Sequence, residues 1–89
     1  PDALPIFEQG FRKRLDELFH VWKEAIARAL RQGQQQDQVR SDVNPDRSAS
    51  FIIAAIEGSI GISKNTQNSE PWDACKEGLE RYVESLLIV

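Results

Sequence analysis

Apolar residues recur every three or four positions through three separate stretches, and this spacing predicts three helices. The first predicted helix runs from about residue 5 to residue 32, the second from 45 to 64 and the third from 70 to 87. No stretch keeps the alternation of apolar and polar residues that marks a strand. The pattern therefore predicts an all-α fold.

Local signals predict where these helices begin and end. Asn44 suits the N-cap of the second helix, and Pro45 suits its first position. Ser69 is the expected cap of the third helix. Gly33 is placed to end the first helix in the left-handed conformation that glycine adopts without strain. The link between the second and third helices is short and polar, so these two helices should form an antiparallel hairpin.

The second helix is apolar around most of its circumference. Only Ser50, Glu57 and Lys64 form a narrow polar wedge when residues are placed at 100° intervals. A helix of this kind must be covered nearly all round. Its small residues, among them Ala54 and Gly58, allow a close helix crossing, either with a second copy of the chain or within one copy. The amount of apolar surface favours the first interpretation, with two hairpins forming a four-helix bundle.

Charge and cysteine content narrow the class of protein. The net charge is -3, from 11 basic and 14 acidic residues, and no basic face is concentrated enough to bind nucleic acid. No apolar run approaches the roughly 20 residues that span a bilayer. A single cysteine excludes an internal disulfide, which fits the cytoplasm. The chain begins at Pro1 and contains no Met, so we expect a piece of a longer protein.

The residues that could carry chemistry form no catalytic, metal-binding or cofactor-binding pattern. His20 has no second histidine or cysteine at metal-ligand spacing. Cys75 lies on an apolar stripe without a histidine to activate it, which favours an inert thiol over a nucleophile. Glu57 is expected in the solvent, with a buried functional carboxylate as the alternative. We therefore predict that the chain is not an enzyme.

The order of the motifs resembles one known family. Ala29-Leu30-Arg31-Gln32-Gly33 closes the first helix, the connection carries Val39-Arg40-Ser41-Asp42-Val43-Asn44-Pro45-Asp46, and the second helix contains Ile56-Glu57-Gly58-Ser59-Ile60. This succession is similar to the C-terminal domain of TetR-type transcriptional regulators, close to the AcrR-like branch, over about residues 7–87. Asp37 departs from the pattern, since related sequences often have glycine there, and this leaves the turn of the connection open.

The resemblance implies a partial C-terminal regulatory and dimerisation domain over residues 1–89. The N-terminal helix-turn-helix domain, which would bind operator DNA, is absent from this chain. Family members usually repress transcription and release DNA when a small effector binds. The partners implied are therefore a second copy, an unknown small-molecule effector and operator DNA, the last through the missing domain only, with no membrane and no cofactor.

Two sets of site residues follow from the helical wheel and the resemblance together. The predicted dimer interface takes residues from the last two helices: Phe51, Ala54, Ala55, Gly58, Ser59, Ile62, Trp72, Cys75, Leu79, Tyr82, Val83 and Leu86. The predicted effector pocket takes residues mainly from the first helix: Phe11, Leu15, Leu18, Phe19, Trp22 and Ile53. The spacing of the aromatic residues alone fits core filling better than ligand contact.

Two other functions stay open from the sequence. One is a helical module that binds a partner protein and takes no small-molecule ligand. The other, which the sequence favours less, is a fragment of an enzyme whose chemistry lies upstream. A basic helix-turn-helix segment before Pro1 would favour the regulator over both.

Overall fold

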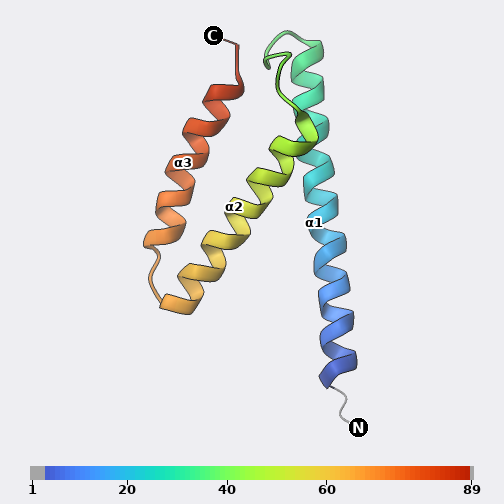
Figure 1. Cartoon of the computed structure of the whole chain (residues 1–89), viewed down its shortest axis with the longest axis vertical. Helices are drawn as coiled ribbons and strands as arrows, with labels where there is room; N and C mark the ends of the chain where they lie inside the picture. Colours follow the sequence, from blue (N-terminus) through green and yellow to red (C-terminus); the bar gives the residue numbers. More distant parts are fainter. Residues whose placement is uncertain (1–3, 89) are drawn as a thin grey trace.

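A computed structural model describes residues 4–88 of the chain, and most of them lie in three helices (Figure 1). These are α1 (Leu4–Gln35), α2 (Pro45–Thr66) and α3 (Glu70–Leu86). The predicted all-α fold is confirmed, and every predicted helix end lies within three residues of the observed one. α2 and α3 run antiparallel, so the predicted hairpin is also confirmed (Figure 1).

The N-terminus of α2 forms as its sequence predicts. The Asn44 side chain accepts a hydrogen bond from the backbone N–H of Arg47 at 3.1 Å, which satisfies one of the free N–H groups of the first turn. Pro45 opens the helix and loses nothing by lacking an N–H there. Asp46 adds a negative charge near the positive end of the helix dipole.

The prediction that Gly33 ends the first helix is wrong. α1 continues to Gln35, and the left-handed residue is Asp37, with φ of 57°. Gly33 is needed for a close approach instead, because a Cβ at this position would lie 2.5 Å from Cγ2 of Val39. Asp37 occupies the position where the family resemblance leads one to expect glycine, and aspartate is among the few residues that tolerate this conformation.

The predicted N-cap position of Ser69 is confirmed, but the capping hydrogen bonds come from other residues. Ser69 occupies the N-cap position, but its side chain makes no capping hydrogen bond to the backbone. Asn68 Oδ1 accepts from the Glu70 N–H at 2.9 Å, and Ser63 Oγ accepts from the Trp72 N–H at 3.0 Å. The last turn of α2 therefore supplies part of the cap of α3, which sequence position alone does not reveal.

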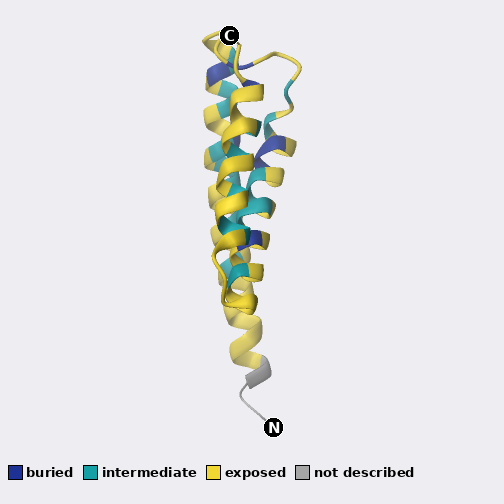
Figure 2. Ribbon diagram, turned by 90° about the vertical axis from the view of Figure 1, so that its left-hand side faces the viewer, coloured by how far each residue is buried: buried dark blue, intermediate teal, exposed yellow. Residues whose placement is uncertain are grey.

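The three helices lie side by side in one layer (Figures 1 and 2). α2 lies in the middle and contacts both neighbours, while α1 and α3 do not touch one another within residues 4–88. The radius of gyration is 16.3 Å, against about 12 Å for a compact domain of this length. Most domains consist of two packed layers that bury the helix faces between them, so a single layer leaves broad helix surfaces exposed.

The interior of the described chain is correspondingly small. Its buried apolar residues are Ala27, Val39, Ala49 and Leu86, and no large side chain in residues 6–88 is fully buried. Val39 forms an isolated antiparallel bridge with Leu87, and this joins the connection to the end of α3. We call this region, residues 33–44 and 85–88, the closed end of the molecule.

Candidate functional site

A groove of about 740 Å³ runs between α1 and α2 and is open to solvent. Its volume lies in the range of small-molecule sites, and its walls are mainly aliphatic and aromatic, as such sites usually are. The residues that line it are Phe11, Leu15, Phe19, Trp22, Ala25 and Ile26 of α1 with Ile53, Ile56, Glu57, Ile60, Gly61 and Lys64 of α2.

The structure brings together five of the six residues predicted for the effector pocket. Phe11, Leu15, Phe19, Trp22 and Ile53 all line the groove. Phe19 and Trp22 meet edge to face, with ring centroids 5.7 Å apart, which is a favourable aromatic geometry. Ligand binding by these residues stays a prediction.

Leu18 is the predicted pocket residue that does not line the groove. Its side chain is 42% exposed. Its angular position on α1 does not explain this, because Leu18 lies within about 20° of Phe11 and Ala25, which both line the groove.

The sequence prediction missed seven residues that line the groove. Ala25 and Ile26 follow Trp22 by three and four positions, and Ile56 and Ile60 follow Ile53 by three and seven. These spacings mark one helix face and could have identified all four. Gly61, Glu57 and Lys64 carry no comparable signal. Glu57 is exposed, as expected from its place in the polar wedge, and it lines the groove from the α2 side.

The twelve predicted interface residues divide into two groups. Seven are buried or half-buried within the single chain: Ala55, Ser59, Trp72, Cys75, Leu79, Tyr82 and Leu86. Contacts across the seam between α2 and α3 explain several of them. The Cys75 thiol donates to the Ala55 carbonyl at 3.4 Å, and the Tyr82 hydroxyl donates to Ser48 Oγ at 3.0 Å. These residues hold the hairpin together.

The other five predicted interface residues are exposed, and four of them form a stripe along α2. We call Phe51, Ala54, Gly58 and Ile62 the outer face of α2; the fifth exposed residue is Val83 on α3. Phe51 and Ile62 are 52% and 55% exposed, and a Cβ at Gly58 would meet no atom within 4 Å. Packing within the chain therefore does not require glycine at position 58. Pairing through this face stays a prediction.

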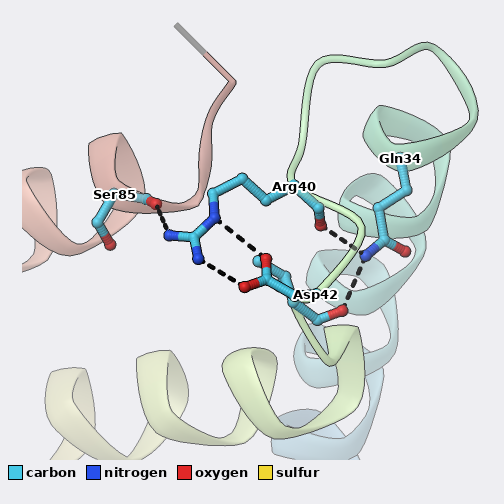
Figure 3. Close-up of polar contacts among 5 residues, drawn as sticks. Gln34, Arg40, Asp42 and Ser85 are labelled. Carbon is cyan, nitrogen blue, oxygen red and sulfur yellow. Dashed lines mark hydrogen bonds and ion pairs between the residues drawn. The ribbon is translucent and has the colours of Figure 1, made fainter.

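Polar contacts at the closed end centre on Arg40 (Figure 3). Its guanidinium donates to both carboxylate oxygens of Asp42, at 3.1 and 2.6 Å, and to the carbonyl of Ser85 at 3.1 Å. The Arg40 N–H donates to the Leu86 carbonyl at 2.9 Å. The hydrogen bond from Arg40 lowers the pKa of Asp42. α3 has no basic residue in its own last turn, so Arg40 provides the positive charge that its C-terminus favours.

Comparison with known proteins places the chain in a family. The family model described as "Tetracyclin repressor-like, C-terminal domain" matches residues 7–79. The chain belongs to this family. The resemblance seen in the sequence is thereby confirmed, and the family is one of transcriptional regulators and not a class of enzymes.

A curated relative supports the same family. The chain is 34% identical over 62 residues to the HTH-type transcriptional repressor DhaR of Mycobacterium sp. (strain GP1). The match covers 70% of this chain and 31% of that repressor, so the chain spans about a third of its relative's length. No solved structure matches the chain. None of the helices in the described part of this family member has the length and hydropathy needed to cross a membrane.

Proposed function

We propose that this chain is the dimerisation and effector-sensing part of a transcriptional repressor of the TetR type. The observation that carries the proposal is the single layer of helices, which leaves an apolar groove on one side of α2 and an apolar outer face on another. Family membership supports the assignment of these two surfaces to an effector and to a second copy of the chain.

The proposed assembly is a homodimer in which two α2–α3 hairpins form a four-helix bundle. Such a bundle would cover the outer face of α2 and give each copy the second layer that its helices lack. A helix-turn-helix domain, which we place outside this chain, would bind operator DNA in the cytoplasm. The chain itself would carry no catalytic residues.

The proposed mechanism is release from DNA when a small molecule occupies the groove. The effector would change the position of α1 relative to the hairpin, and thus the spacing of the two DNA-binding domains. The change requires that the effector bind one arrangement more tightly than the other. The mainly apolar walls of the groove favour a largely apolar effector, because apolar surface buried against them leaves water.

The test of pairing is the molar mass of the chain in solution across a dilution series, measured by light scattering. We expect a dimer with twice the 10.1 kDa of the single chain. Gly58→Leu should convert it to a monomer, because the new side chain would prevent close approach of the partner. Within one copy this leucine has free space, and it should favour the helix by roughly 1 kcal/mol.

Gly10→Leu is the matched control, since a Cβ at Gly10 also meets nothing within 4 Å but lies on α1, away from the hairpin. Ser59→Leu is a poor probe of pairing because Ser59 is buried within the single chain. A well-folded monomer at high concentration would contradict the proposal and favour a module that binds a different protein.

A further inference from the structure

α1 and α3 communicate only through α2 and through the connection that follows α1. The two helices share no contact within residues 4–88. The groove lies between α1 and α2, whereas the proposed pairing surface belongs to α2 and α3. A change in the position of α1 can therefore reach α3 by a second route, which is the segment from residue 36 to residue 44.

This segment is held firmly to the end of α1. The Gln34 side chain, on α1, donates hydrogen bonds to the carbonyls of Arg40 and Val43 at 3.0 and 2.8 Å (Figure 3). The backbone N–H groups of Gln38 and Val39 both donate to the Gly33 carbonyl. Val39 is buried directly against Gly33, so the connection cannot move away from α1 without opening this contact.

The same segment is held equally firmly to the end of α3. Arg40 binds the last turn of that helix twice, through its backbone N–H to Leu86 and through its guanidinium to Ser85. The Ile88 N–H donates to the Gln38 carbonyl at 2.9 Å. Two carbonyls that have no partner inside α3 are thus satisfied by one residue of the connection. Asp42 holds the guanidinium in place through two parallel hydrogen bonds.

We propose that Arg40 couples the groove to the pairing surface by linking the C-terminal ends of α1 and α3. Arg40 is a positioning residue in this proposal and contacts neither the effector nor the second copy. The inference rests on the proposed function. When a ligand shifts α1, the connection moves with it and displaces the end of α3, and pairing in turn changes the affinity of the groove. Thermodynamic linkage requires that the two effects be equal.

The test measures the dimer dissociation constant by sedimentation, with and without a saturating apolar fluorescent probe, N-phenyl-1-naphthylamine. In the unmodified chain the probe should change this constant by about fivefold or more, the lower end of typical allosteric coupling. In Arg40→Ala the probe should still bind and the chain should still pair, but the change should fall below about twofold. If Arg40 had a purely structural role, Arg40→Ala would weaken probe binding or pairing, but the probe would still change the dimer dissociation constant by the same factor.

Two further variants test whether the loss of coupling is specific to the hydrogen bonds of Arg40. Arg31→Ala is the matched control, because it removes an exposed ion pair between α1 and α2, Arg31 to Asp46 at 3.4 Å, that does not reach α3. It should keep the full change. Arg40→Lys keeps the charge but cannot form the same set of hydrogen bonds, so it should reduce the change even if Arg40→Ala does not fold.

An equal change in the unmodified chain and in both Arg40 variants would overturn the inference alone. The inference would also fall, with the proposed function intact, if the probe binds and the chain pairs without any effect of one on the other. A chain that binds no probe or does not pair would overturn the proposed function and this inference together.

Discussion

The closed end and the outer face of α2 differ in how far their apolar side chains are exposed to solvent. At the closed end, Val39 and Leu86 are 6% exposed and lie within a set of backbone and side-chain hydrogen bonds. Along the outer face, Phe51 and Ile62 are more than half exposed although they are at least as large. Among residues 6–88, the apolar side chains larger than alanine that are buried, Val39 and Leu86, both lie at the closed end. The contrast supports the proposal that the exposed apolar residues of the outer face contact a second copy of the chain.

The largest expected effect of a single substitution is at the closed end. Leu86→Ala removes a buried side chain and should lower the free energy of unfolding by about 2–4 kcal/mol, from lost burial and the cavity left behind. Leu87→Ala is the matched control. The Leu87 side chain is the next one along the chain and is 42% exposed, so its removal should lower the free energy of unfolding much less. Urea titrations of both variants measure this difference. Equal losses would show that the closed end is not a special region of the chain.

Two glycines should respond in opposite directions to the same substitution. Gly33→Ala places a Cβ against Val39, which should cost about 1–3 kcal/mol by overpacking, partly offset by the better helix propensity of alanine. Gly10→Ala has free space and should stabilise the chain by up to about 1 kcal/mol. Thermal unfolding followed by circular dichroism measures both. Stabilisation by Gly33→Ala would mean that the contact with Val39 is loose.

Two leucines, both predicted for the pocket, should differ in their effect on ligand affinity. Leu15 lines the groove and Leu18 does not. Leu15→Ala should weaken the binding of N-phenyl-1-naphthylamine by about tenfold, the equivalent of roughly 1–2 kcal/mol of lost apolar contact. Leu18→Ala should leave the affinity unchanged within about twofold, on the same reasoning. A fluorescence titration gives both constants, and a larger loss for Leu18 would place the ligand elsewhere.

The smallest expected effect concerns pH and the exposed pair of Arg40 and Asp42. The hydrogen bond from Arg40 lowers the pKa of Asp42 below its ordinary value of 3.8. A carboxylate with a lowered folded pKa stabilises the fold above its unfolded pKa, and this stabilisation is lost as the pH falls through the folded pKa. Asp42→Asn should therefore be less stable than the unmodified chain at pH 6, and the difference should shrink toward pH 3.

The control for this pH effect is the same substitution in a chain that already carries Arg40→Ala. Without the guanidinium, Asp42→Asn should no longer change how stability depends on pH. A difference that persists there would assign the pKa shift to another group. High salt should reduce the effect in the unmodified chain, because both side chains are at least half exposed.

The helices and the main groove residues could be predicted because they depend on local spacing. The apolar stripe of α1 and the capping by Asn44 involve residues within one or two turns of each other. The sequence also indicated that α2 needs cover on several sides. It could not divide the apolar residues of α2 and α3 between the hairpin seam and the outer face, because both sets have helical spacing and differ only in which neighbour they meet.

The features that the sequence did not predict all depend on long-range contacts. Gly33 carries the same local signal as a helix-ending glycine, and only the approach of Val39 shows its actual role. The cap of α3 uses Ser63 from the preceding helix. Arg40 satisfies carbonyls 45 and 46 positions later in the chain, which no local pattern can reveal.

Hydrogen exchange at several protein concentrations tests the contrast between the closed end and the outer face most directly. Amides of residues 54–62 on α2 should exchange more slowly as the concentration rises and pairing covers the outer face. The amides of Val39, Arg40 and Ile88, which are bonded within one copy, should exchange at rates that do not depend on concentration. Exchange on α2 that is independent of concentration, or protection that rises equally in both regions, would contradict the account.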